Sequence, residues 1–312
     1  MKKLLKWLVK TTLALFLILN IVVIFHAYKF THYYEPSEVT IKAKENKTEW
    51  DKTADLLFGF DAVKQQNTPA DTIFETVTFT TEKGLNIEAW YMAVDSSVGT
   101  VAIFHGHGGK KSALLPEAAR FRKLGYNTLL VDFRAHGGSQ GNTCTIGFKE
   151  VEDVKLAYDY LAKKDEKNII LYGVSMGAST VIKAIKDYAI SPAKIILEMP
   201  FGSLENAVEG RLNIMNLPPQ PLATLLTFWG GTIRGFWAFG HNPSSYASAI
   251  KAPVLLQWGR LDPRVTEAET MDIYNNISTP KKMVVYEQSG HESFCKKEKE
   301  KWAAEIKAFL QQ

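Results

Sequence analysis

Six short apolar runs, alternating with helix-like segments, restrict the fold of this chain more than any other feature. Each run is nearly continuous in apolar residues, whereas a strand with one solvated face alternates apolar and polar residues. The runs are residues 100–104, 128–131, 169–172, 195–197, 254–256 and 283–285. Helical spacing occupies residues 112–124, 151–163, 176–188, 267–276 and 297–310. We therefore expect an α/β fold, with a mostly parallel central sheet and helices on both faces.

An antiparallel hairpin is predicted before this parallel pattern. Residues 76–80 and 87–92 alternate apolar and polar side chains, and Lys83-Gly84 between them is a turn sequence. The fold is therefore expected to begin with two antiparallel strands.

A long segment interrupts the alternation after the sixth predicted strand. Residues 201–250 lie between strands, and an insertion at the carboxyl ends of parallel strands lies where open α/β sheets bind ligands. We expect a small cap whose apolar composition suits acyl chains; an ordinary crossover packed on the sheet is the alternative. The cap residues expected to line the substrate pocket are Phe228, Trp229 and Trp237.

The N-terminus combines four lysines with an uncharged apolar run. Lys2, Lys3, Lys6 and Lys10 are the only charged side chains among the first ten residues, and residues 11–28 carry no formal charge. About 20 apolar residues cross the hydrocarbon core of a bilayer. Because no small-residue cleavage site follows, a retained membrane anchor is favoured over a cleaved signal peptide. The positive-inside rule then predicts a cytoplasmic N-terminus and an extracytoplasmic catalytic domain.

This lysine cluster accounts for the formal net charge of +4. The rest of the chain carries equal numbers of basic and acidic residues, so nothing predicts a nucleic-acid surface. The length of 312 residues accommodates one large α/β domain with additions. We assign residues 1–30 to the lysines and transmembrane anchor, 31–70 to a juxtamembrane connector and 71–312 to the α/β domain. Within the connector, residues 48–60 have helical spacing and are expected to pack on the domain edge.

A predicted strand runs directly into the sequence Gly173-Val174-Ser175-Met176-Gly177, and a helical segment follows. A serine nucleophile must be presented away from its backbone, and a sharp strand-to-helix turn does this in a strained conformation. Glycines at Gly173 and Gly177 leave room for the neighbouring backbone. The turn also places the N–H of Met176 at a helix N-terminus, where it can stabilise an oxyanion. The pattern predicts a nucleophile elbow.

A base and an acid for Ser175 are expected in loops at the same sheet edge. His291 follows the last predicted strand, and Asp262 follows the strand before it, which gives the chain order Ser, Asp, His. Glu198 and Asp132, also at strand ends, are the rival carboxylates. We expect these two to organise loops by hydrogen bonding instead.

The second oxyanion donor is expected in the glycine-rich loop His105-Gly106-His107-Gly108-Gly109, where the N–H of His107 is our candidate. The two histidines of this loop have no accompanying carboxylate or cysteine cluster, so no metal site is predicted. Cys144 and Cys295 are the only cysteines. Two cysteines do not form a disulfide framework, and both a disulfide and free thiols remain open.

Several segments together resemble the α/β-hydrolase superfamily. They are the loop 105–109, the segment Asp132-Phe-Arg-Ala-His-Gly-Gly-Ser-x-Gly141, the elbow 173–177, Gly259-x-x-Asp262 and Gly290-His291, in the expected order. Within the superfamily, the chain resembles serine aminopeptidase-like and monoacylglycerol-lipase-like hydrolases, including membrane-anchored members of the Bem46 type. The resemblance covers about residues 70–312, and it implies that the 132–141 segment is a structural loop beside the active site.

These residues predict a membrane-anchored serine hydrolase that cleaves an ester through a Ser175–His291–Asp262 triad and an acyl-enzyme. Its expected partners are a small-molecule acyl substrate and the membrane, and no cofactor is implied. Alternatives are a serine aminopeptidase or amidase, an acyltransferase and, least favoured, a non-catalytic binding module. An aminopeptidase usually needs an acidic or polar subsite for the substrate amine, for which Glu205 and Glu209 of the cap are candidates.

Overall fold

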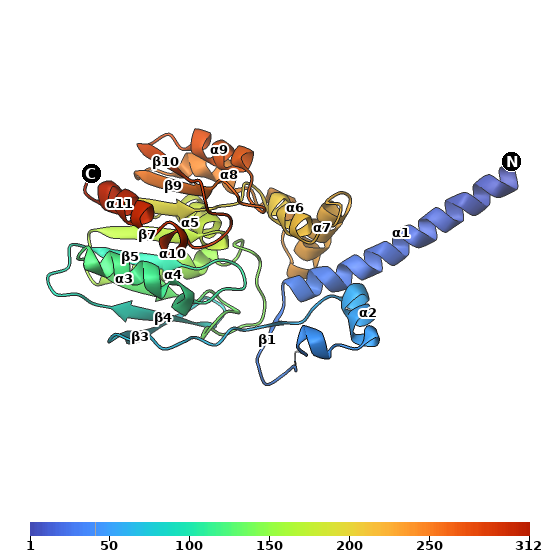
Figure 1. Ribbon diagram of the computed structural model, residues 1–312, viewed down its shortest axis with the longest axis horizontal. Coiled ribbons are helices and arrows are strands. Elements are labelled where there is room, and N and C mark those ends of the chain that lie inside the picture. The colour runs from blue at the N-terminus through green and yellow to red at the C-terminus, as the bar shows by residue number, and fades with distance from the viewer. Residues whose placement is uncertain (41) are drawn as a thin grey trace.

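The computed structural model describes residues 1–40 and 42–312, and its centre is an eight-stranded sheet (Figure 1). The strand order is β10-β9-β8-β7-β5-β6-β4-β3. Strand β4 is antiparallel to both of its neighbours, and the other pairs are parallel. The strands are β3 (Glu75–Thr80), β4 (Asn86–Met92), β5 (Thr100–Phe104), β6 (Asn127–Val131), β7 (Ile169–Val174), β8 (Lys194–Glu198), β9 (Val254–Gly259) and β10 (Lys281–Tyr286).

Two hydrophobic cores lie on opposite faces of this sheet. Side chains alternate along β5, so Ala102 and Phe104 enter one core and Val101 and Ile103 the other. Helices α4 (Val151–Lys163), α5 (Met176–Tyr188), α8 (Pro243–Tyr246) and α9 (Glu267–Asn276) cover the first face. Helices α3 (Leu115–Lys123), α10 (Phe294–Lys297) and α11 (Lys299–Leu310) cover the second. Burial on both faces explains why the central strands are almost entirely apolar.

The fold class that the sequence predicts for this domain is confirmed. The antiparallel start, the parallel strands and the cap after the sixth strand of the sheet are all present. Two helical segments are divided: the turn η2 (Lys111–Leu114) precedes α3, and residue 298 separates α10 from α11. Its φ of −120° and ψ of 56° are non-helical.

The cap between β8 and β9 consists mainly of α6 (Leu204–Ile214) and α7 (Leu222–Arg234). The short turns η3 (Ala238–Gly240) and η4 (Ala247–Ala249), with α8 between them, lead back to the sheet. The side chain of Ser203 accepts a hydrogen bond from the N–H of Asn206 and caps α6, while Gly235 ends α7 in a left-handed conformation. The cap is therefore a helical pair at the carboxyl ends of the strands.

Helix α1 (Lys2–Phe30) extends away from the domain as a single rod (Figure 1). It is long and apolar enough to cross a membrane, and most of its surface is exposed. At 1.5 Å per residue its length is roughly 44 Å, more than a hydrocarbon core of about 30 Å. The apolar run predicted from the sequence is thus confirmed as a possible membrane anchor.

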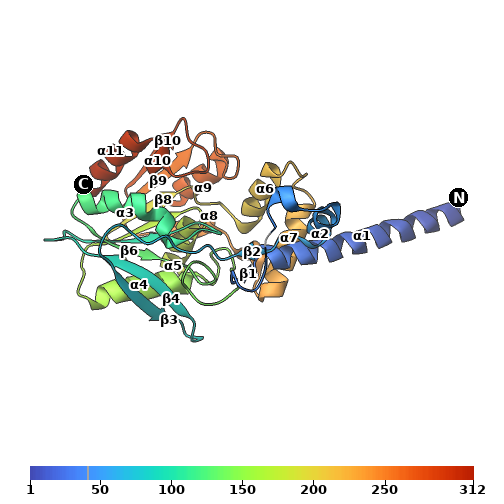
Figure 2. The same cartoon turned by 60° about the horizontal axis from the view of Figure 1, so that its bottom comes forward.

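The carboxyl-terminal part of α1 packs against the cap, as both views show (Figures 1 and 2). The indole Nε1 of Trp229 on α7 donates to Asn20 Oδ1 at 2.8 Å, and Arg234 Nε donates to Thr31 Oγ1 at 2.7 Å. The guanidinium of Arg234 also lies 4.9 Å from the ring centroid of Tyr28. Helix α7 therefore runs beside about the last ten residues of α1.

The connector packs on α1, contrary to our expectation that its helix would lie on the domain edge. After the turn η1 (Lys44–Asn46), Thr48 and Asp51 form a capping box that starts α2 (Glu49–Phe58). Phe58 meets Phe25 of α1 edge-to-face at 5.1 Å, and His26 Nε2 lies 2.9 Å from the carbonyl of Leu56. The short strands β1 (Tyr33–Tyr34) and β2 (Ala62–Val63) then pair in parallel. Phe58 of α2 thus contacts the neighbouring long helix, while Trp50 and Leu56 stay exposed.

Candidate active site

Ser175 lies at a sharp turn between β7 and α5. Its φ of 52° and ψ of −117° form a strained conformation for a residue with a side chain. A Cβ added at Gly177 would lie 2.3 Å from the carbonyl oxygen of Phe104, and one added at Gly173 would lie 2.6 Å from the backbone of α5. Both glycines are therefore required by close backbone approach, and the turn projects Ser175 beyond the end of the sheet.

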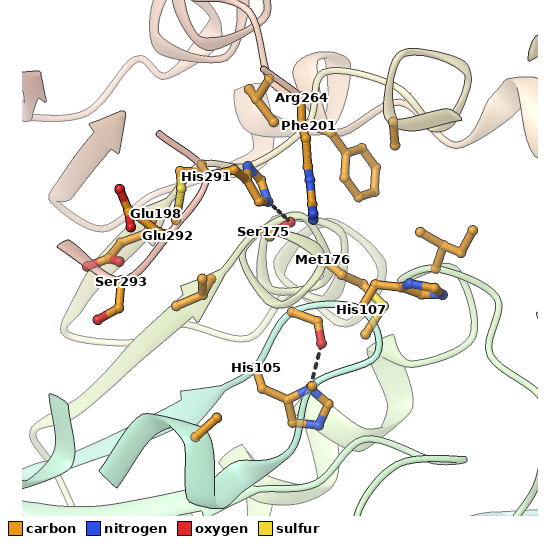
Figure 3. A pocket seen from close by; sticks show the side chains of 18 of the residues that line it. His105, His107, Ser175, Met176, Glu198, Phe201, Arg264, His291, Glu292 and Ser293 are labelled. Carbon is orange, nitrogen blue, oxygen red and sulfur yellow. Dashed lines mark hydrogen bonds between the residues drawn. The ribbon is translucent and has the colours of Figure 1, made fainter. Parts of the chain in front are cut away.

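The structure brings Ser175, His291 and Asp262 together. Figure 3 shows the contact between Ser175 and His291. Ser175 Oγ is 2.9 Å from His291 Nε2, and His291 Nδ1 is 2.7 Å from Asp262 Oδ2. Since an ionised carboxylate only accepts hydrogen bonds, Nδ1 carries the imidazole proton and Nε2 accepts from the serine hydroxyl. The other oxygen of Asp262 accepts the N–H groups of Arg264 and Val265 at 2.8 and 3.0 Å, which fixes the carboxylate.

The two rival carboxylates have other partners. The carboxylate of Asp132 accepts hydrogen bonds from the Lys111 N–H at 2.6 Å, the Lys111 ammonium at 2.5 Å, Asn67 at 2.6 Å and the Gly138 N–H at 2.8 Å. Glu198 Oε1 accepts from Trp302 Nε1 at 2.5 Å and Gln257 Nε2 at 3.2 Å. Asp132 organises the loops next to the site, and Glu198 joins β8, β9 and α11.

The buried carboxyl of Glu198 is expected to make the free energy of unfolding depend on pH. Burial raises the pKa of its carboxyl to about 8, and Glu117 and Tyr172 also face it. Because the folded chain holds this proton while the unfolded chain releases it near pH 4.5, stability falls as pH rises from about 5 to about 8. The difference is on the order of 4 kcal/mol. We expect Glu198→Gln to flatten this fall, measured by denaturant unfolding between pH 5 and pH 9. A parallel decline in both proteins would contradict the assignment.

Two backbone N–H groups flank the serine. A Cβ added at Gly106 would lie 3.4 Å from the Cβ of Ser175, so the glycine-rich loop passes directly beside the nucleophile. Across residues 1–40 and 42–312, neither the N–H of His107 nor that of Met176 donates a hydrogen bond to another residue. Both donors named from the sequence therefore lie next to Ser175 without a protein acceptor.

The histidines of the neighbouring loops hold the backbone in place. His105 Nε2 accepts the N–H of Phe133 at 3.1 Å, and His136 Nε2 accepts the N–H of Gly108 at 3.1 Å. Burial lowers the pKa of the His107 imidazole to about 4, and its Nε2 lies 3.1 Å from the hydroxyl of Tyr33. These imidazoles are neutral structural groups. Within the described residues, no group of three or more His, Cys, Asp or Glu side chains is arranged to hold a metal ion.

A cavity of about 330 Å³ opens above Ser175. Its wall includes Phe201, Ala207 and Val208 of the cap segment, and Phe30 at the end of α1. The ring of Phe30 stacks on His107 at 4.7 Å. Sequence reasoning missed Phe30 because it assigned α1 to the membrane alone, and no local pattern connects residue 30 to residue 107.

The prediction that cap aromatics from α7 and the loop after it line the pocket is wrong. Phe228, Trp229 and Trp237 are absent from the cavity lining among the described residues. Phe228 and Trp237 are 42% and 66% exposed, and Trp229 bonds to α1. The reason is that α7 packs on α1 and α6, so α6 carries the face of the cap toward Ser175.

Both cysteines are free and buried. Cys144 Sγ lies 3.7 Å from the sulfur of Met176, and burial raises the pKa of the Cys295 thiol to about 12. The sequence left both a disulfide and free thiols open, and in the structure both thiols are free and protonated.

Known proteins support this architecture. The model of the serine aminopeptidase S33 family (Hydrolase_4) matches residues 95–232. The uncharacterized protein YqkD of Bacillus subtilis is 26% identical over 231 residues, which are 73% of this chain and 76% of that protein. The crystal structure of the Pyrococcus furiosus esterase Pf2001 superposes with a TM-score of 0.66 at 25% identity, covering 80% of this chain and 95% of the esterase. The chain has the α/β-hydrolase fold.

A further relative is a membrane protein. The uncharacterized membrane protein YNL320W of Saccharomyces cerevisiae is 24% identical over 139 residues, which are 43% of this chain and 48% of that protein. The match thus spans about half of the length of that relative. The match to the serine aminopeptidase family model and the likeness to the esterase support a hydrolase.

Proposed function

We propose that this α/β hydrolase is a membrane-anchored serine hydrolase that cleaves an ester bond of an apolar acyl substrate. The observation that carries the proposal is the continuous hydrogen-bond chain from Ser175 Oγ through His291 to Asp262, with distances of 2.9 and 2.7 Å. A serine hydroxyl is a weak nucleophile unless an oriented base takes its proton. The arrangement supplies that base next to a cavity of about 330 Å³.

In the proposed reaction, His291 takes the proton of Ser175 as the serine oxygen attacks the acyl carbonyl. The N–H groups of His107 and Met176 stabilise the oxyanion that forms. His291 then gives the proton to the leaving alcohol, and an acyl-enzyme remains. Water activated by His291 releases the acid and restores the serine. Asp262 keeps the imidazole in the required tautomer and stabilises its charged form.

The anchor and the pocket are parts of one structure in this proposal. Phe30, the last residue of α1, lines the cavity, so the end of the proposed anchor forms part of the pocket wall. Apolar side chains are exposed around that end, on α2, on α7 and in the loops of the cap. They include Trp50 (77% exposed), Leu56 (71%), Phe228 (42%) and Trp237 (66%). Such a surface next to a membrane helix suits the bilayer interface. We place Lys2 to Lys10 in the cytoplasm and the catalytic domain outside it.

Phe30→Ala is expected to lower kcat/KM for medium-chain 4-nitrophenyl esters about 10-fold, because an aromatic wall of the acyl pocket is removed. The measurement uses the full-length chain in nonionic detergent. Phe16→Ala is the matched control, since Phe16 lies on the same helix, 52% exposed and outside the cavity lining. An equal loss in both variants would show that α1 acts only as an anchor.

Labelling the full-length protein with a fluorophosphonate probe tests the proposed function. We expect a covalent adduct that mass spectrometry locates on Ser175, together with hydrolysis of 4-nitrophenyl esters. A folded protein that neither labels nor hydrolyses any ester would overturn the proposal.

The family name makes aminopeptidase activity the second candidate. Its expected amine subsite lacks support, because Glu205 and Glu209 bond to Thr224 and Gln220 at the α6–α7 contact. Neither glutamate is among the described residues that line the cavity. Comparing aminoacyl amides with esters of the same acyl length separates the two activities.

A further inference from the structure

Two arginines line the cavity above Ser175: Arg264 is partly buried, and Arg211 is exposed with its guanidinium 5.9 Å from the ring centroid of Phe30. Helix α6 directs Ala207, Val208 and Arg211 to the cavity, since residues four apart share one face of a helix. Arg264 comes from the loop after β9, two residues beyond Asp262, and also lines the cavity. In Figure 3 its side chain extends from this loop toward Ser175. Two elements distant in sequence thus bring positive charge to one place beside the nucleophile.

These two cations lack an anionic partner within the described part of the chain. No carboxylate lies within 4.0 Å of either guanidinium, and neither donates a side-chain hydrogen bond. The carboxylate of Asp262 is occupied by His291 and by two backbone N–H groups. Arg260, four residues earlier, shows the contrast: it pairs with Glu267 at 3.0 Å and Glu287 at 3.3 Å.

Arg264 is partly buried and lies near a like charge. Burial and the neighbouring Arg211 cation lower the pKa of its guanidinium. Both arginines also lower the pKa of the His107 imidazole, next to the proposed oxyanion donor. Two like charges beside a partly buried cavity repel one another unless an anion lies between them. Planar guanidinium groups bind carboxylate and phosphate oxygens through paired hydrogen bonds.

We propose that Arg264 and Arg211 form an anion subsite, and that the ester cleaved at Ser175 carries a negatively charged oxyanion group close to the scissile carbonyl. This inference rests on the proposed function and specifies its substrate class. The group is a phosphate, as in an anionic phospholipid, or a carboxylate, as in a dicarboxylic half-ester. The same charges disfavour a substrate with a free ammonium, which is a second argument against an aminopeptidase.

Paired esters that differ in charge test the subsite. The soluble pair is 4-nitrophenyl butyrate and mono-4-nitrophenyl succinate, and the lipid pair is a monoacylglycerol and a lysophosphatidylglycerol with the same acyl chain. The full-length protein is assayed in nonionic micelles at fixed ionic strength. Arg264→Gln, Arg211→Gln and Arg264→Lys are compared with Arg260→Gln, the matched control on the same loop. Unfolding temperatures show that each variant is folded.

The measured quantity is the ratio of kcat/KM for the anionic ester to that for the neutral ester. We expect Arg264→Gln to lower this ratio about 10- to 100-fold, the value of one hydrogen-bonded ion contact. Arg264→Lys should retain part of it, and Arg260→Gln should leave it unchanged. A fall in the soluble pair alone supports a carboxylate, and a fall in the lipid pair alone supports a phosphate. An unchanged ratio in both pairs overturns the subsite.

Failure of the proposed function gives a different result. In that case neither ester of either pair is hydrolysed and Ser175 is not labelled by fluorophosphonate. Hydrolysis of the neutral esters without charge selectivity in the wild-type protein overturns only the anion subsite.

Discussion

Ser175→Ala is expected to lower kcat for 4-nitrophenyl esters by about 10⁴-fold or more and to abolish fluorophosphonate labelling. The substitution removes the atom that would form the acyl-enzyme, while the Cβ and the strained backbone at φ 52° remain. Residual hydrolysis would come only from the N–H groups of His107 and Met176 and from substrate binding. The measurement is burst and steady-state kinetics of the full-length protein in nonionic detergent.

Ser248→Ala is the matched control for this variant. Ser248 lies in η4, is exposed, and bonds to the carbonyl of Ser245. Wild-type turnover in the Ser248 variant together with near-zero turnover in the Ser175 variant would assign the nucleophile. Undiminished turnover after Ser175→Ala would move catalysis to another group.

Asp262→Asn is expected to lower kcat about 10³- to 10⁴-fold at neutral pH. An amide can donate a hydrogen bond to His291 Nδ1, which favours the tautomer whose proton is on Nε2, and that nitrogen no longer accepts from Ser175. The structural cost should be small, because the amide oxygen can still accept the N–H groups of Arg264 and Val265. Kinetics and thermal unfolding of the same preparation check both parts.

Asp272→Asn on α9 is the control for Asp262→Asn, because Asp272 is exposed and lies outside the cavity lining. A loss in the Asp262 variant that comes only with unfolding would assign a structural role to this carboxylate. Activity close to wild type would mean that another group orients His291.

Much of the sheet domain follows from local sequence. The run 100–104 and the segments 151–163, 176–188 and 267–276 coincide with β5, α4, α5 and α9. The agreement arises because strands buried on both faces must be apolar, and because apolar spacing and caps are local signals. The candidate triad follows as well, since parallel strands end at one edge and bring the loops containing Asp262 and His291 to Ser175.

The cap and the anchor have contacts that local sequence patterns do not predict. The aromatic run around Phe228 and Trp237 indicates an apolar helix, but its composition does not reveal which neighbour covers it. Helix α7 packs on α1, so Phe228 and Trp237 lie outside the cavity while Phe30 forms part of its wall. The helix of the connector also packs on α1. These contacts join residues far apart in the chain, and only the packing of whole elements determines them.

The sequence by itself determined the fold class, the N-terminal helix that is long enough to cross a membrane and the candidate triad at Ser175. Each of these depends on periodicity, chain order or a short turn motif. Tertiary structure alone decided that two arginines meet at the pocket. Arg211 and Arg264 are 53 positions apart and unremarkable in their own segments. They meet because α6 folds over the carboxyl end of β9, and the nearby carboxylate of Asp262 is already engaged by His291 and by two backbone N–H groups.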